Sequence, residues 1–295
     1  MVPTLHSRLE AVLDGSTGPA LVSEQLKRNP RMSRFPTLMY HRILSDRHPV
    51  PDPEERPWAV TAEAFSLQMV RLADSGRIGV SMGQVHEALA AGRHVPAQWV
   101  AITFDDGNES DYAEALPVLA ARGFRATFFV CGERVDAPGG LSRAALREMH
   151  GAGMHIGSHA MTHRFLTTLD GAAERDELAR SRDLLESVVG ARVDHFAPPG
   201  GRWSARTERA LRDLSFCAVS TSVFGYNDAA RVRFAYRRIP VVLATTLDRF
   251  EAVARGSRTP LLPDYARATV LSAVRGALGE RAYARVRAAR PGGGS

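Results

Sequence analysis

The stretch WVAITFDDGNES, residues 99–110, decides how the rest of the chain is interpreted. An apolar run typical of a buried β-strand leads directly into two adjacent carboxylates, Asp105 and Asp106, and then Gly107. Asp and Gly are common turn residues, so the triplet alone predicts no more than a solvated turn. The two adjacent carboxylates would indicate a functional site only if polar or charged side chains also follow the other predicted strands.

Apolar runs alternate with helical patterns from about residue 35 to residue 245. The expected strands are FPTLMYH, RIGV, WVAITF, RATFFVCG, MHIGSHA, HFAPP and finally FCAVST. Helices are expected between them, one entered at Thr61 and another capped by Ser142. Repeated strand-helix units indicate an α/β protein with a parallel sheet, either open or closed into a barrel.

The same pattern predicts the domain organisation. Residues 1–34 are expected to form a helical N-terminal extension, 35–245 the main α/β domain, and 246–290 a helical, basic C-terminal appendage. Residues 291–295, which end in GGGS, are expected to be an artificial tail. We find no signal-peptide pattern at the start and no apolar run of membrane-spanning length, so the expected location is the cytoplasm.

The formal net charge of +6 comes entirely from the C-terminal region. Residues 249–295 contain nine arginines against Glu251, Asp264 and Glu280, while the rest of the chain is balanced. A solvated helix face is the favoured interpretation of this excess, and peripheral contact with a membrane or an anionic carrier is the alternative. No nucleic-acid partner is expected.

Polar groups follow several of the expected strands at the same position. They are His41, Asp105 and Asp106, then Ser158, His159 and His163, and the PPGG run at 198–201. The carboxyl ends of parallel strands lie on one face, so these groups should converge. Two imidazoles and a carboxylate form a ligand set that leaves positions open on a metal such as zinc. One Asp of the doublet can bind the metal while its neighbour remains available as a general base.

Two of these stretches resemble motifs of the polysaccharide deacetylases of the NodB type, carbohydrate esterase family 4. TFDDG, residues 103–107, resembles the first motif, which implies Asp105 as catalytic base and Asp106 as metal ligand. SHAMTH, residues 158–163, resembles the second, which implies His159 and His163 as the other ligands. The resemblance covers roughly residues 35–245 and implies a distorted (β/α) barrel with helical N- and C-terminal extensions.

Two departures from the family pattern concern the base and the general acid. The third motif, FAPPGG at 196–201, has Ala197 where the family has an arginine that orients the base, and Gly200 where it has an aromatic residue. Arg202 or Arg238 is a candidate replacement, and Pro199, Gly200 and Trp203 are further candidates for substrate, oxyanion or base contacts. The family's late acid histidine is missing, and MYHRI resembles the exopolysaccharide branch, which implies His41 as the acid.

The expected activity is removal of acetyl groups from N-acetylglucosamine-type units of a glycan by a metal-dependent hydrolase. The expected cofactor is one divalent ion, with Zn²⁺ as first choice and Co²⁺ or Ni²⁺ as alternatives. A hydrolase of another C–N amide and a glycan-binding pseudoenzyme are the competing hypotheses.

Four further side chains have less certain roles. His155, four residues before His159, is expected to be a packed histidine or a partner of a ligand. Cys131 and Cys217 are expected to be buried thiols without a basic neighbour. Trp58, like Trp203, is a candidate for stacking on a sugar ring.

Overall fold

The computed structural model describes residues 34–48, 55–262 and 264. Its strands are β1 (Arg34–Phe35), β2 (Thr37–Tyr40), β3 (Ile43–Leu44), β4 (Val60–Thr61), β5 (Ile78–Val80), β6 (Trp99–Phe104), β7 (Thr127–Val130), β8 (His155–Ser158), β9 (His195–Phe196), β10 (Ala218–Phe224), β11 (Asn227–Asp228) and β12 (Ala235–Pro240). Its longer helices are α3 (Ala62–Asp74), α4 (Met82–Ala90), α5 (Leu116–Ala120), α6 (Arg143–Gly151), α7 (Gly171–Val189), α8 (Ala205–Asp213) and α9 (Leu247–Ala254).

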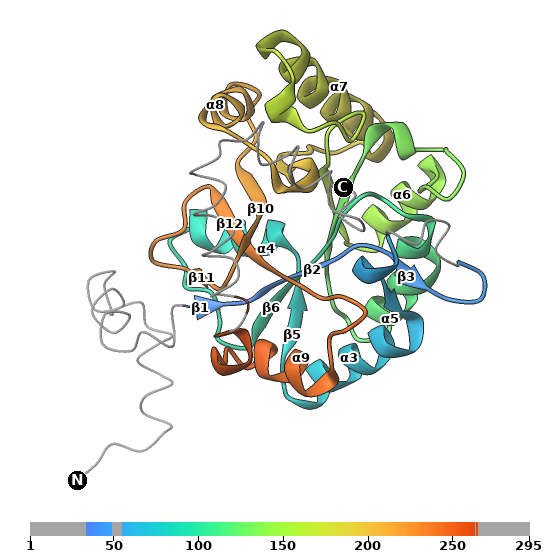
Figure 1. Ribbon diagram of the computed structural model, residues 1–295, viewed down its shortest axis with the longest axis vertical. Helices are drawn as coiled ribbons and strands as arrows, with labels where there is room; N and C mark the ends of the chain where they lie inside the picture. Colours follow the sequence, from blue (N-terminus) through green and yellow to red (C-terminus); the bar gives the residue numbers. More distant parts are fainter. Residues whose placement is uncertain (1–33, 49–54, 263, 265–295) are drawn as a thin grey trace, which may run out of the picture.

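The central sheet is a closed ring of parallel strands. Its order is β2-β12-β10-β9-β8-β7-β6, and β6 pairs again with β2 to close the ring. β5 lies outside the ring, where it pairs with the beginning of β6. Helices surround the ring (Figure 1). This is the (β/α) barrel that the family resemblance implies. The terminal extensions that were expected to be helical lie largely outside the described residues.

Local signals in the sequence explain where most of the helices begin. Thr61 accepts a hydrogen bond from the backbone of Ala64 at the start of α3, and Ser142 does the same for α6. The helix expected between WVAITF and RATFFVCG is present but irregular. Pro117 has no N–H group to donate, and the segment forms a wide π-helical turn over Asp111–Ala115 followed by the short α5.

The expectation that FCAVST is the last strand was also wrong. β12 lies between β10 and β2 and therefore completes the ring. Its sequence, AYRRIP, contains two adjacent arginines and does not resemble a buried strand. Arg237 is exposed, but Arg238 is one of the largest fully buried side chains.

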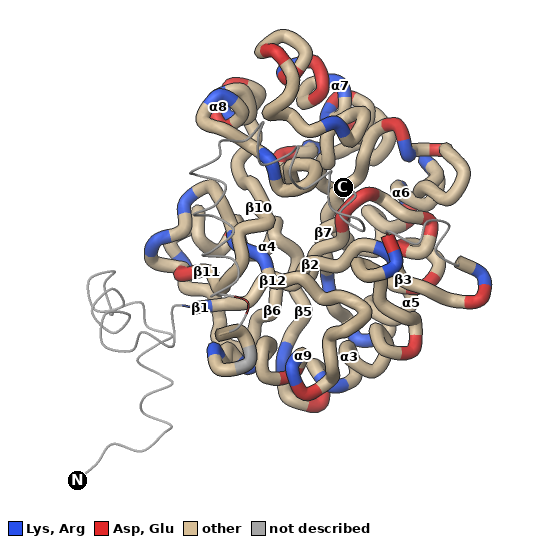
Figure 2. Tube along the Cα trace, viewed as in Figure 1, with Lys and Arg blue, Asp and Glu red and all other residues tan. Residues whose placement is uncertain are grey.

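The first part of the predicted C-terminal appendage packs into the core of the barrel domain. Phe250, Val253 and Ala254 of α9 belong to the same buried cluster as Phe65 and Leu72 of α3. The basic residues from 265 onward lie outside the described residues. On the helices of the described part, such as α7 and α8, positive and negative side chains are mixed (Figure 2). None of the helices described combines the length and apolar character needed to cross a bilayer.

Candidate active site

Asp106, His159 and His163 converge at the carboxyl ends of the barrel strands. Asp106 follows β6, and the two histidines lie in the loop after β8. One ligand atom from each lies within 4.8 Å of the others. The Asp106 Oδ1 atom is 3.4 Å from Nε2 of His159 and 3.2 Å from Nε2 of His163. The sequence predicted this grouping.

The backbone and its contacts hold these side chains in place. Asp106 and His163 both have left-handed backbone conformations, with φ of 82° and 59°, which cost free energy in residues other than glycine and often mark functional sites. His159 is buried, and its Nδ1 donates to the carbonyl of Ala197 at 2.8 Å. That bond leaves Nε2 free to bind a cation, an arrangement typical of metal-binding histidines.

Glu177 supports the loop that carries His163, and sequence reasoning missed it. Its carboxylate on α7 accepts hydrogen bonds from the backbone of Met161 at 3.0 Å and Thr162 at 2.8 Å. It also accepts one from the Thr162 hydroxyl. A signal was present, because Glu177 lies next to Leu178 on the buried face of an amphipathic helix, where a charge needs a partner.

The donor set fits a divalent cation with open coordination positions. The side chain of His159 is 3% exposed, that of Asp106 21% and that of His163 44%, so the cluster opens to solvent on one side. Burial would raise the pKa of Asp106, but hydrogen bonds from His159 and His163 hold it well below its usual value. The bond to Asp106 raises the pKa of His163 despite burial.

Asp105 lies beside this cluster and forms a buried pair with Arg238. Nη1 and Nη2 of Arg238 donate to the two carboxylate oxygens at 2.6 and 2.8 Å, and Nε donates to the carbonyl of Thr221. Burial would raise the pKa of Asp105, whereas the charge of Arg238 and, more weakly, that of His159 keep it below its usual value. Of the two arginines considered to replace the one missing at Ala197, the structure brings Arg238 to Asp105.

Arg202 has a different environment. Its guanidinium group lies 4.2 Å from the centre of the Phe165 ring. Gly200 has a φ of 59°, and a Cβ atom there would lie 2.5 Å from the same ring. Phe165 thus occupies the space that a side chain at position 200 would need. Pro199 is buried, and Trp203 is partly buried against an apolar cluster.

His41 follows β2, which pairs with β6 so that Tyr40 is opposite Phe104. His41 and Asp105 therefore leave adjacent strands at the same end of the barrel. The buried Nδ1 of His41 has no hydrogen-bond partner in the described ranges, and its ring lies 5.6 Å from that of Trp58. Trp58 is 37% exposed, so an aromatic face borders the mouth of the barrel at this point.

His155 is a packed histidine, one of the two roles expected for it, whereas Cys217 differs from its prediction. His155 begins β8 and so lies at the opposite end of the barrel from His159, beyond contact with the predicted ligands. Cys217 is half-buried, and its Sγ is 3.7 Å from Nδ1 of His195, so it does have a basic neighbour. Cys131 is buried as expected.

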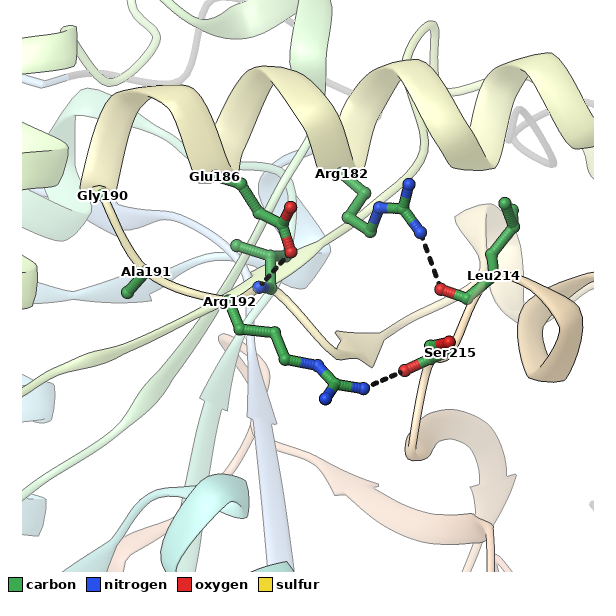
Figure 3. Close-up of a pocket in the computed structure, with 8 residues that line it drawn as sticks. Arg182, Glu186, Gly190, Ala191, Arg192, Leu214 and Ser215 are labelled. Carbon is green, nitrogen blue, oxygen red and sulfur yellow. Dashed lines mark hydrogen bonds between the residues drawn. The ribbon is translucent and has the colours of Figure 1, made fainter.

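A hollow on the described surface lies away from this site (Figure 3). It lies at the end of α7, where Arg182 donates to the carbonyl of Leu214 and Arg192 to that of Ser215. These bonds occupy the charged groups that line it. It is a gap between a helix and two loops, and it has no convergent catalytic groups.

Comparison with known proteins agrees with the geometry. A family model described as polysaccharide deacetylase matches residues 92–219. YxkH of Bacillus subtilis (strain 168), whose name assigns it to the polysaccharide deacetylases, is 26% identical over 209 residues, 71% of this chain and 72% of that protein. The poly-β-1,6-N-acetyl-D-glucosamine N-deacetylase of Escherichia coli (strain K12) is 34% identical over 85 residues, 29% of this chain and 13% of that protein.

The fold comparison points to the same family. The structure of the Streptococcus pyogenes deacetylase PplD in complex with acetate superposes with a TM-score of 0.66 and 25% identity, covering 73% of this chain and 96% of that one. Matches to chitin deacetylases cover less than half of those proteins. Residues 92–219 therefore belong to the polysaccharide deacetylase family.

Proposed function

We propose that the protein is a metal-dependent N-deacetylase that removes acetyl groups from N-acetylglucosamine-type units of a glycan. The observation that supports this most strongly is the convergence of Asp106, His159 and His163 beside the Asp105–Arg238 pair. The E. coli relative is named for N-deacetylation of a polymer of N-acetylglucosamine, and PplD was solved with acetate. Zinc is the proposed ion, because it accepts one carboxylate and two imidazoles.

Each side chain of the site has a proposed task. The ion held by Asp106, His159 and His163 would supply Lewis-acid chemistry at the acetamide carbonyl and make water more acidic. Asp105, whose carboxylate Arg238 orients, accepts the proton of the attacking water. His41 gives a proton to the nitrogen that leaves. Acetate and a free amine are the products.

Acetate release tests the proposal directly. The full chain, loaded with Zn²⁺, is expected to release acetate from short N-acetylglucosamine oligomers and to lose this activity when the metal is chelated. Cyclic amides serve as the comparison substrates. Hydrolysis of a cyclic amide without acetate release would favour an amidase, and binding of the oligomers without acetate release would favour a pseudoenzyme. The Asp105–Arg238 pair argues against the pseudoenzyme, because it replaces the orienting arginine missing at Ala197.

Removing two metal ligands is expected to remove the ion. The double variant Asp106→Ala, His163→Ala should contain one metal ion fewer per chain than wild type, because a single imidazole, His159, remains. Elemental analysis of metal-loaded protein measures this. His94→Ala, which changes an exposed histidine, is the control. Unchanged metal content in the double variant would show that these side chains do not bind the ion.

His41→Ala is expected to lose most of the rate and the alkaline limb of the pH-rate profile. A general acid must be protonated to act, so the wild-type rate should fall as pH rises above the pKa of the acid. His94→Ala again serves as the control, and metal content is measured in both variants. If His41→Ala retains near-normal activity with the same alkaline limb, another group supplies the proton.

A further inference from the structure

A second cluster of metal-binding side chain types lies at the other end of the barrel. His155 begins β8, His195 begins β9, and Cys217 immediately precedes β10. His86 reaches them from α4. At about 3.3 Å per residue, β8 alone separates His155 from His159 by about 13 Å. The second cluster thus shares no residue with the proposed active site.

The side chains of this cluster are close enough to share one ion. One ligand atom from each of His86, His195 and Cys217 lies within 4.8 Å of the others. His155 and Asp194 form a second such group with His195. The His195 ring lies edge to face with both neighbouring imidazoles, at centroid distances of 5.4 Å from His86 and 4.5 Å from His155.

His195 gives an independent indication of a ligand. It is 2% exposed, and its Nδ1 bonds to Oδ1 of Asp194 at 2.8 Å. Its buried Nε2 has no hydrogen-bond partner among the residues that the structure describes. A buried polar atom left without a partner costs about 1–3 kcal/mol, and an ion is one of the few ways to satisfy it. A carboxylate on the other ring nitrogen is typical of histidines that bind metals. The Sγ atom of Cys217 lies 3.7 Å from that same Nδ1, so its side chain would rotate toward Nε2 to share an ion with it.

We propose that His86, His195 and Cys217 form a second binding site for a divalent cation of the zinc type, with Asp194 orienting His195. Two imidazoles and one thiolate are characteristic ligands of Zn²⁺ and Co²⁺. The Cys217 thiol must lose its proton to bind a cation. Binding therefore forms one sulfur-metal bond and releases one proton.

The position of the site indicates a structural task. α4 follows β5, the strand outside the closed ring, and His86 would connect α4 through the ion to His195 at the start of β9 and Cys217 before β10. Val85 of α4 and Ala218 of β10 belong to one buried apolar cluster. The amino ends of barrel strands commonly serve stability, while catalysis occurs at the carboxyl ends. The ion would thus fasten α4 to the barrel.

Co²⁺, added as the only metal, is the probe that distinguishes the two proposed sites. The proposed active site contains no sulfur, so a near-ultraviolet thiolate-to-cobalt charge-transfer band can arise only from a cysteine. The full chain should bind two Co²⁺ ions and show this band. Cys217→Ser should lose the band and one ion while retaining deacetylase activity with zinc. Cys131→Ser is the matched control and should keep both, because the Cys131 thiol bonds to the carbonyl of Met161.

A second set of variants guards against misfolding and separates this inference from the proposed function. His163→Ala should still show the thiolate band, whatever its effect on activity. His86→Ala, which changes a half-buried residue, should weaken cobalt binding at the second site and abolish the rise in Tm that Zn²⁺ produces there. No band in wild type, a band that depends on Cys131, or unchanged cobalt content in Cys217→Ser would each overturn the proposal.

Discussion

Asp105→Asn is expected to lower turnover by a factor of about 10²–10⁴ while the metal content stays at the wild-type value. Asparagine has nearly the same shape as aspartate but cannot accept a proton from water at neutral pH. Asp105 has no predicted bond to the ion, and its two oxygens bond to Arg238. Asp105→Asn should therefore lose turnover but keep its metal. Steady-state kinetics on N-acetylglucosamine oligomers, with elemental analysis of the same samples, measure both.

Asp106→Asn provides the matched comparison, because the two residues are adjacent but differ in proposed role. It should weaken metal binding, and its activity should recover in part when the metal concentration is raised. Asp105→Asn should not recover. If Asp105→Asn loses its metal and Asp106→Asn keeps it, the roles of the two acids are reversed.

Arg238→Met is expected to lower the free energy of unfolding by about 3–5 kcal/mol, the usual effect of removing one partner of a buried ion pair. Methionine fills a similar volume, so the loss comes mainly from the buried, unpaired charge of Asp105 rather than from a cavity. Arg238 also bonds to Thr221 and Thr103 within the barrel. Urea unfolding, with the slope compared between variants, measures the change.

Arg237→Ala is the control for this prediction, because Arg237 is adjacent but exposed, and surface substitutions usually change stability by about 0.5 kcal/mol or less. The double variant Asp105→Asn, Arg238→Met should be less destabilised than the two single changes together, since neither charge is then left unpaired. Equal effects of Arg237→Ala and Arg238→Met on stability would contradict the importance of the buried pair.

The sequence predicted the parts of this protein that depend on local pattern. The ring strands from β2 to β10 coincide with apolar runs in the sequence. Asp106, His159 and His163 were predicted to converge because each comes just after such a run. β12 was missed, because the two arginines in AYRRIP argue against a buried strand. The choice of Arg238 over Arg202 could not be made either. It depends on a contact between residues 133 positions apart.

The cluster of His86, His195 and Cys217 could not be predicted from the sequence either, because it joins residues that are far apart in the chain. Cys217 was expected to lack a basic neighbour, and along the chain that is correct. Its neighbour in space is His195, which comes from another strand 22 positions earlier. The spacing along β8 already places His155 about 13 Å from His159, but its contact with His195 on the neighbouring strand could not be predicted from periodicity.

The place of β12 in the ring has a consequence for how the chain matures during synthesis. A ribosome adds about 5–20 residues per second, so Asp105 emerges many seconds before Arg238. Until β12 inserts between β10 and β2, the gap in the ring leaves Asp105 in contact with water, where its charge needs no partner. We therefore expect the nascent chain to remain open and protease-sensitive until the last strand arrives, and the base to acquire its orientation only at that final step.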